Sequence, residues 1–261
     1  MSRTIAFVRK PGFSFIQAIS SHPERHTINV ERALSQHQHY VSTLKENGIE
    51  VVAFPPLEEC PDAPFVEDTT LVFGHMAVAC SNKEKSRQGE SRSIHAEIKK
   101  YRRLETLPES ATLDGGDVLD TKEKLFVGIS RRTNLKAVDA LTKLTRRQVI
   151  PVEISSGLHL KTAATYLGEN TLVINSCSIK TSVFDKFKCI KVEETDQYAA
   201  NCLAIGDKVL MAAGTKNLAT NIQAEGFKTI ELDMSEFEKA DGGLTCLSII
   251  FKKDADKIFN L

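Results

Sequence analysis

Residues 238–251 read EKADGGLTCLSIIF, and this stretch near the end of the chain decides the fold. Two glycines lead into Cys246, and the apolar run that follows is typical of a buried strand. Residues 4–9 read TIAFVR, a run of the same kind at the other end of the chain. Whether these two strands belong together depends on the pattern of the chain between them.

Four segments between the two ends repeat one design, in which a strand, a turn and a second strand follow one another. Their sequences are FVEDTTLVFGHMAVACS, DGGDVLDTKEKLFVGIS, TAATYLGENTLVINS and NCLAIGDKVLMAAG. Helical spacing follows in IHAEIKKYRRL, NLKAVDALTKL and NLATNIQAEG. The second strands align at Met76, Leu125, Thr171 and Val209, at intervals of 49, 46 and 38 residues. Gly168-Glu169-Asn170 and Gly206-Asp207 are the predicted turns of the third and fourth copies.

A fifth copy divides between the two ends of the chain. LTCLSIIF supplies its first strand and TIAFVR its second, and a helix over residues 29–48 and the strand IEVVAFP follow. We therefore expect an α/β protein, a five-bladed pseudo-fivefold α/β propeller of ββαβ modules, in one catalytic domain over residues 1–261. The alternative is an open nucleotide-binding sheet, but RKPGFS has one glycine where a dinucleotide fingerprint needs three.

The composition gives no sign of a charged macromolecular partner. Of the 261 residues 41% are hydrophobic and 26% charged, and lysine plus arginine equals aspartate plus glutamate at 34 each. The net charge of zero favours neither nucleic acid nor an anionic membrane. No apolar run approaches the ~20 residues that cross a bilayer, and MSRTIAFVRK does not resemble a secretion signal. We expect a soluble, cytoplasmic protein.

The six cysteines predict free thiols. They stand at positions 60, 80, 177, 189, 202 and 246, and no two have the C-x-x-C spacing of a structural zinc site. Most lie in or beside apolar runs, so the first interpretation of each is a buried structural thiol, Cys246 included.

Residues at equivalent points of the five copies should converge on the propeller axis. The segments that enter the first strands carry Glu67, Asp68, Asp114, Asp117, His159 and Cys246. A thiol, an imidazole and a carboxylate that orients it are the groups that nucleophilic catalysis requires. Alone, each Asp-Gly-Gly would be a turn and His159 a structural histidine. Their common register favours a catalytic interpretation.

Six motifs together resemble the dimethylarginine dimethylaminohydrolases, a family within the guanidino-group-modifying superfamily. They are VRKPGFS, FVEDT, LDGGDVL, LFVGISRRTN, GLHLKT and DGGLTC, which run in this order over nearly the whole chain. The resemblance implies the five-bladed α/β propeller, or pentein fold, that the repeats predict. It also implies hydrolysis of Nω-methylated arginines to citrulline and a methylamine, without a cofactor.

The resemblance assigns roles to ten residues. Cys246 matches the nucleophile, His159 the acid and base, and Asp114 the acid that orients the histidine, a position that is Glu in some members. The matches for substrate binding are Glu67 and Asp68 at the guanidinium, Asp62, Ile19 and Ala240 at the α-amino group, and Arg87 and Arg132 at the α-carboxylate. Arg92 is an alternative to Arg87. Zinc could inhibit by binding Cys246 and His159.

Other functions share parts of this pattern. Arginine deiminases and amidinotransferases resemble the same scaffold but are longer, and a non-catalytic methylarginine-binding paralogue would lack part of the catalytic set. The preference between dimethyl- and monomethylarginine stays open, as does the choice between monomer and homodimer. Residues 9–22 are the expected lid, with Gly12 as a hinge.

Overall fold

A computed structural model describes residues 3–254, which form two compact units. The first unit comprises the chain up to Glu109, Ser235–Gly242 and the chain from Cys246 on. The second comprises Ser110–Met234 and Gly243–Thr245. The expected single catalytic domain over residues 1–261 extends beyond the described residues and stays a prediction.

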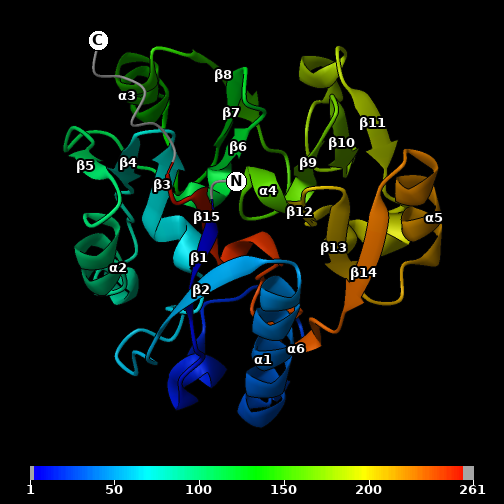
Figure 1. The fold of residues 1–261 in the computed structure, drawn as a ribbon, viewed down its shortest axis with the longest axis horizontal. Helices are drawn as coiled ribbons and strands as arrows, with labels where there is room; N and C mark the ends of the chain where they lie inside the picture. The colour runs from blue at the N-terminus through cyan, green and yellow to red at the C-terminus, as the bar shows by residue number, and fades with distance from the viewer. Residues whose placement is uncertain (1–2, 255–261) are drawn as a thin grey trace. The chain divides into compact units, whose positions relative to one another are not determined.

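Fifteen strands of the described chain form five three-stranded sheets of one design (Figure 1). In each sheet the middle strand pairs antiparallel with one neighbour and parallel with the other. The first unit contains the sheets β15 (Ile249–Lys252)–β1 (Thr4–Arg9)–β2 (Ile49–Phe54) and β3 (Thr70–Phe73)–β4 (Met76–Ala79)–β5 (Arg103–Thr106). The second contains β6 (Val118–Asp120)–β7 (Lys124–Ile129)–β8 (Gln148–Glu153), β9 (Ala164–Gly168)–β10 (Thr171–Ile174)–β11 (Lys188–Lys191) and β12 (Leu203–Ile205)–β13 (Lys208–Ala212)–β14 (Lys228–Leu232).

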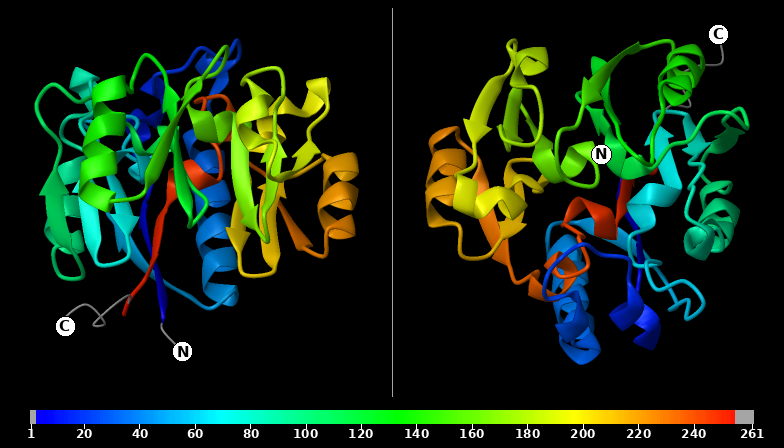
Figure 2. Two further views of the ribbon diagram at one scale, coloured as in Figure 1. Left: turned by 90° about the horizontal axis from the view of Figure 1, so that it is seen from above. Right: turned by 180° about the vertical axis from the view of Figure 1, so that it is seen from behind.

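The pairing of β15 with β1 confirms that one module combines the two ends of the described chain. Thr4 lies opposite Lys252 and Phe7 opposite Ile249, and Figure 2 shows the red and blue strands side by side. The predicted strand LTCLSIIF is too long, because β15 begins only at Ile249 and Thr245–Leu247 forms a 3₁₀ helix. Cys246 therefore lies in a turn of helix just before the strand.

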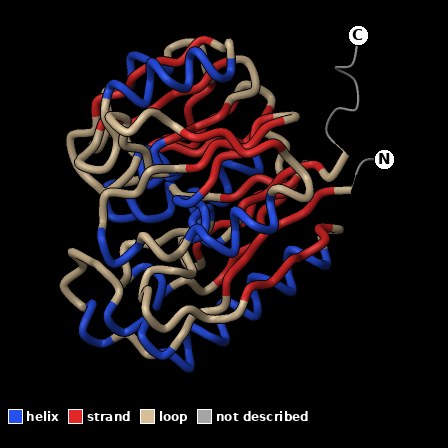
Figure 3. Tube along the Cα trace, turned by 90° about the vertical axis from the view of Figure 1, so that its left-hand side faces the viewer, coloured by secondary structure: helices blue, strands red, loops and turns tan. Residues whose placement is uncertain are grey.

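The connections from the middle to the third strand are helical (Figure 3). They are α1 (Val30–Glu46), α2 (Ser91–Ile98), α3 (Leu135–Thr145) and α5 (Lys216–Ala224), while a 3₁₀ helix, Thr181–Phe184, precedes β11. Asn29 and Asn134 begin α1 and α3, since their side chains accept hydrogen bonds from backbone N–H groups three residues on. The short helices α4 (Leu160–Ala163) and α6 (Ser235–Glu238) lie outside this scheme.

Helix α2 is shorter than its sequence suggested. The spacing in IHAEIKKYRRL predicts a helix to residue 104, but α2 ends at Ile98. The ring of Tyr101 packs against Phe7 and Phe251, with centroids 5.8 and 5.6 Å apart, and Arg102 donates to the carbonyl of Lys253 at 3.2 Å. These contacts with distant segments hold the chain in a non-helical path that a local pattern does not reveal.

The predicted hairpin turns are confirmed. Gly168, Glu169 and Asn170 have φ values of 104°, 47° and 56°, and Gly206 has 64°. Glycine and asparagine adopt this left-handed region at low cost, which is why such residues join antiparallel strands.

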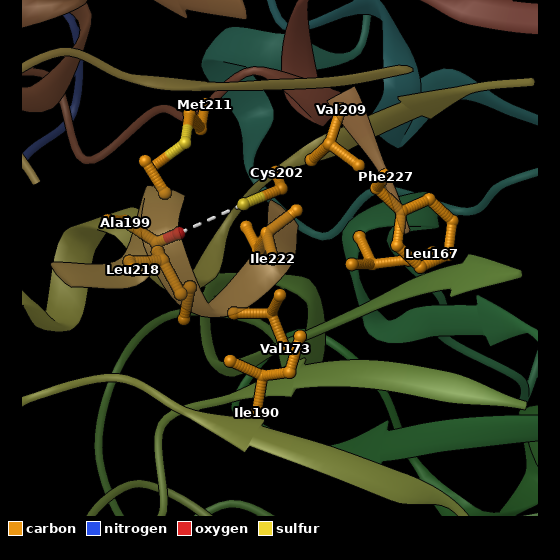
Figure 4. Packing of buried hydrophobic residues seen from close by; sticks show 12 residues of the cluster. Leu167, Val173, Ile190, Ala199, Cys202, Val209, Met211, Leu218, Ile222 and Phe227 are labelled. Atoms are coloured by element: carbon orange, nitrogen blue, oxygen red, sulfur yellow. Dashed lines mark hydrogen bonds between the residues drawn. The ribbon is translucent and has the colours of Figure 1, made fainter. Parts of the chain in front are cut away.

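Each unit has an apolar core of its own. In the second unit one cluster includes Cys202, Met211, Ile222 and Phe227 (Figure 4). Cys202 is fully buried there, and burial raises the pKa of its thiol to about 12. This confirms a structural thiol at Cys202, and all six cysteines are free. No helix among residues 3–254 is long and apolar enough to cross a membrane.

Candidate active site

The ten residues predicted for the site divide between the two units. The first unit contains Ile19, Asp62, Glu67, Asp68, Arg87, Ala240 and Cys246, and the second contains Asp114, Arg132 and His159. All of them except Ile19 are buried. Charged side chains are rarely buried unless they are paired or have a function, so the partners of each one matter.

Asp114 and His159 form a buried pair in the second unit. Asp114 precedes the 3₁₀ helix Gly115–Asp117, and His159 is the residue before α4. Nε2 of His159 lies 3.1 Å from Oδ2 of Asp114. A carboxylate only accepts, so Nε2 carries the hydrogen and Nδ1 is the nitrogen left for proton transfer. The shorter acid at position 114 therefore still reaches the histidine.

Arg132 lies beside the same carboxylate. Its Nη1 is 3.8 Å from Oδ2 of Asp114, at the long end of an ion pair. The loop that carries Arg132 is fixed because Ser130 Oγ accepts hydrogen bonds from the N–H groups of Arg132 and Thr133, at 3.0 and 3.2 Å. The second unit thus brings together all three of its predicted site residues.

The residue before Cys246 is anchored in the second unit. Oδ1 of Asn201 accepts from the N–H of Thr245 at 3.0 Å, and its Nδ2 donates to Thr245 Oγ1 at 3.1 Å. The same Nδ2 donates to the carbonyl of Lys161 at 2.8 Å, two residues beyond His159. Within the second unit, Asn201 therefore ties Thr245 to the segment that carries His159.

Arg87 forms the centre of a buried ionic cluster in the first unit. Its guanidinium contacts both carboxylate oxygens of Glu90 at 2.9–3.1 Å, Asp68 Oδ2 at 2.9 Å and the carbonyl of Phe65 at 3.3 Å. Burial disfavours the charge, but Asp68 and Glu90 outweigh it and hold the pKa of Arg87 well above its usual value. The alternative, Arg92, is exposed.

Glu90 is the member of this cluster that titrates near neutral pH. Burial is the largest influence and raises the pKa of Glu90 to about 7. The negative charges of Asp62 and Asp68 add to the rise, while Arg87 opposes it. The positive charge of Arg87 is thus shared among the carboxylates of Glu90, Asp68 and Asp62.

Ile19 and Ala240 lie on two segments that hydrogen bonds hold together. Ser20 Oγ donates to the carbonyl of Lys239 at 2.7 Å, and the N–H of Ser21 donates to Asp241 Oδ2 at 2.6 Å. The N–H of Ile19 donates to Asp62 Oδ1 at 3.1 Å. The first unit therefore brings together the three residues predicted for the α-amino end of the substrate.

The glycine pair before Cys246 permits a close approach. A Cβ atom at Gly242 would lie 2.2 Å from the ring of Phe65, just before the acids Glu67 and Asp68. In α1, buried Tyr40 is hydrogen-bonded to Ser248 at 2.7 Å. Burial raises the pKa of Tyr40 far above its usual value, and the charges of Glu67 and Cys246 contribute. Glu67 and Cys246 therefore both lie within electrostatic range of the Tyr40 hydroxyl.

The sequence did not reveal several supporting residues. Glu90 had one signal, since it stands three residues after Arg87 and such residues lie on one side of a helical turn. Asn201 had none, because its partner Thr245 lies 44 residues away in the chain. Tyr40 and Ser248 are separated by 208 residues.

Sequence comparison identifies close relatives over nearly the whole chain. A family model described as "N,N dimethylarginine dimethylhydrolase, eukaryotic" matches residues 14–251. The N(G),N(G)-dimethylarginine dimethylaminohydrolase of Streptomyces coelicolor is 32% identical over 249 residues, which cover 94% of this chain and 95% of that protein. The protein of the same name from Pseudomonas aeruginosa is 30% identical over 225 residues, 84% of this chain and 89% of the relative.

Solved structures share the fold. A cysteine-to-serine mutant of the Pseudomonas aeruginosa protein, in complex with citrulline, superposes with a TM-score of 0.91 and 28% identity, over 96% of this chain and 100% of that one. The N-terminal domain of ArgZ, a cyanobacterial arginine dihydrolase, gives 0.88 at 24% identity, over 95% and 97% of the two chains. These similarities confirm the predicted five-bladed α/β propeller of ββαβ modules.

Proposed function

Because the chain belongs to the dimethylarginine dimethylaminohydrolase family, we propose that it hydrolyses free Nω-methylated L-arginines to L-citrulline and dimethylamine or methylamine. It is a hydrolase that acts on C–N bonds of linear amidines. The observation that carries the proposal is the buried Asp114–His159 pair, with Nε2 and Oδ2 3.1 Å apart. An acid in that position fixes the tautomer and orientation of a catalytic imidazole.

Cys246 is the nucleophile in the proposed first step. His159 takes the thiol proton, and the sulfur adds to the central carbon of the guanidinium as one C–N π bond becomes a lone pair. The tetrahedral adduct collapses by breaking the bond to the methylated nitrogen, which leaves as an amine with the proton from His159. A thiouronium, joined to Cys246 through sulfur, remains.

Water completes the reaction. His159, now neutral, takes a proton from the water as its oxygen adds to the thiouronium carbon. The second adduct expels the sulfur, and the proton returns to Cys246. The second hydrogen of the water passes from the product's hydroxyl to the released amine, which ends as an ammonium ion. Citrulline leaves with the oxygen of the water, so atoms, protons and charge balance without a metal or organic cofactor.

The roles at the two ends of the substrate follow the same family pattern. The carbonyls of Ile19 and Ala240 and the carboxylate of Asp62 would hold the α-ammonium, which the hydrogen bonds between their segments support. Arg132 and Arg87 would hold the α-carboxylate, and Glu67 and Asp68 would pair with the guanidinium. Arg87 Nη1 donates to Asp68 Oδ2 at 2.9 Å, so this guanidinium lies beside an acid assigned to the same substrate.

The test is citrulline release from asymmetric dimethylarginine, monomethylarginine and arginine. We expect turnover of the two methylated substrates, and a loss of at least about 10³-fold for Cys246→Ser, since a hydroxyl is a far weaker nucleophile at neutral pH. Cys177→Ser is the matched control because that thiol is exposed. Its rate should equal that of the wild type.

Each other outcome identifies a different function. Preference for unmethylated arginine would make the protein an arginine hydrolase of the kind named for ArgZ. No citrulline from any substrate, with methylarginine still bound in calorimetry, would make it a non-catalytic paralogue. The partner in each case is a small molecule. We also propose a cytoplasmic location, which the balanced charge and free thiols support.

A further inference from the structure

Asp117 is a buried carboxylate to which the reaction above gives no role. It ends the 3₁₀ helix that follows Asp114 and is fully buried. Two segments of the second unit, one at Leu160 and the other the loop of Ser130 and Thr133, supply three donors to its two oxygens. Oδ1 accepts from the N–H of Leu160 at 3.0 Å, and Oδ2 accepts from Ser130 Oγ at 2.7 Å. The hydroxyl of Thr133 supplies a further hydrogen bond.

The polarity of this network is fixed. Ser130 Oγ already accepts the N–H groups of Arg132 and Thr133, so its own hydrogen points to Asp117. Thr133 Oγ1 accepts from the N–H of Asp114 at 3.2 Å, so its hydrogen is also available to Asp117. Every group that reaches Asp117 is a donor. Only a side chain that accepts at both ends satisfies them all, and a carboxylate is that side chain.

The space beside the Asp117 carboxylate is too small for a side chain at position 128. A Cβ atom at Gly128 would lie 2.7 Å from Asp117 Oδ1 and 2.8 Å from the Cβ of Leu160. The backbone of β7 therefore approaches the carboxylate where no side chain could stand. Burial raises the pKa of Asp117, while His159 and the hydrogen bonds from Thr133, Ser130 and Leu160 oppose the rise.

We propose that Asp117 is the positioning residue of the second unit, which sets His159 through the N–H of Leu160 and Arg132 through Ser130. The hydrogen bond from Leu160 holds the residue next to His159. The hydrogen bond from Ser130 holds the loop that places the Arg132 guanidinium beside Asp114. This inference rests on the proposed function, since it assigns His159 to catalysis and Arg132 to substrate binding.

Three variants separate the two connections. Asp117→Asn keeps its Oδ1 on Leu160 and turns an N–H₂ toward Ser130, so the Arg132 connection alone is lost. Ser130→Ala removes the same connection from the other side. Both should raise KM about tenfold and leave kcat within about threefold. Asp117→Ala removes both connections and should also lower kcat about 100-fold. Asp120→Asn is the control, because Asp120 is exposed and pairs with Arg147 at 2.9 Å.

The split between kcat and KM decides the proposal. Wild-type kcat and KM in folded Asp117→Ala would overturn it, as would an equal loss in Asp120→Asn. A Ser130→Ala enzyme that loses kcat but keeps KM would overturn the assignment of the Arg132 connection. If Asp117→Ala does not fold, Asp117→Asn and Ser130→Ala decide together, and an unchanged KM in both refutes the proposal.

Amide hydrogen exchange distinguishes failure of the positioning role of Asp117 from failure of the proposed function. If the wild type releases no citrulline, the function is wrong, but the network is still measurable. Exchange at the Thr133 amide should quicken in Asp117→Asn and Ser130→Ala, while Leu160 stays protected. Loss of Asp117 should expose Leu160 as well. Wild-type exchange at both amides in Asp117→Ala would overturn the positioning role independently of turnover.

Discussion

Glu90 shows what a single buried acid does to a protein's response to pH. It accepts three hydrogen bonds from Arg87, which stabilise its charged form. The nearby carboxylates of Asp62 and Asp68 destabilise that charged form by repulsion. Burial is the largest influence and raises its pKa from 4.5 to about 7. The folded protein therefore binds a proton on Glu90 more tightly than the unfolded chain does.

This difference predicts a stability change between pH 4.5 and 7. Because the folded-state pKa is the higher one, Glu90 stabilises the folded protein below pH 4.5 and loses that contribution as the pH rises through about 7. Denaturant unfolding of the wild type should therefore lose up to about 3 kcal/mol over this range relative to Glu90→Gln, which cannot titrate.

The comparison with Glu90→Gln is necessary because His37 acts in the opposite sense. Burial lowers the pKa of His37 to about 4, so His37 stabilises above its unfolded pKa of 6.5 and loses that contribution as the pH falls through 4. The wild-type curve alone sums both effects. Parallel curves for the wild type and Glu90→Gln would show that Glu90 does not titrate near neutral pH.

The sequence singled out the residues proposed for catalysis but not the residues that support them. Cys246 and His159 stood out because thiols and imidazoles are rare and occupied equivalent points of a repeat. Asn201 and Ser130 did not, because a common polar residue becomes informative only when its partner is known. Asp117 was noticed for its position, but its three donors come from two segments, one at Leu160 and one at Ser130 and Thr133, that lie apart from it in the sequence.

Among the elements, the segment over residues 9–22 is the predicted lid, and hydrogen bonds attach it at both ends. It includes a 3₁₀ helix, Phe13–Gln17, with Phe13 77% exposed. Glu58 accepts hydrogen bonds from the N–H groups of Phe13 and Ser14, at 3.0 and 2.8 Å. These two bonds hold the front of the segment, while Ser20 and Ser21 hold its end.

The lid hypothesis predicts how this segment is cleaved by chymotrypsin. Glu58→Ala should increase the rate of cleavage after Phe13 about tenfold, since losing the two bonds costs about 1–2 kcal/mol of local stability. Excess citrulline should slow cleavage in the wild type if the segment closes over a bound molecule. Glu59→Ala is the matched control, being the exposed neighbour. A cleavage rate that citrulline does not change would contradict the lid.

Element boundaries were predicted where a local signal exists. Asn29 and Asn134 cap α1 and α3 as their sequences suggest. The early end of α2 and the late start of β15 were missed, because Tyr101 and Thr245 are fixed by contacts with distant residues. Hairpin turns and helix caps depend on residues that are neighbours in the sequence, so a local pattern predicts them. Contacts between residues far apart in the sequence leave no local pattern.

At the scale of the whole molecule, the order of the strands matters less than their pairing. β15 and β1 are adjacent in one sheet, and the N–H of Lys253 donates to the carbonyl of Arg3 at 2.7 Å. The repeat predicted this adjacency, because four complete modules left a first strand at the C-terminal end and a second and third strand at the N-terminal end. A repeat is readable from sequence even when its copies share few residues.

A circular permutant tests that view. A short Gly/Ser linker would join residue 254 to residue 3, and new ends would open the exposed turn between Gly206 and Asp207. Citrulline release should stay within about threefold of the wild type, because each strand pair is retained. A permutant opened inside β7, between Phe126 and Val127, should fail to fold. Equal failure of both permutants would mean that the chain order itself is required.

The split module has a consequence for synthesis on the ribosome. β1 emerges before its antiparallel partner β15, and the strands of the four other sheets are made between them. At about 5–20 residues per second, β1 waits roughly 10–50 seconds with that edge unpaired. An unpaired strand edge invites association with other chains, so a chaperone that shields apolar strands would be most useful in this interval. Cys246 lies just before β15, so a nascent chain gains its proposed nucleophile only as the sheet of β15, β1 and β2 becomes able to form.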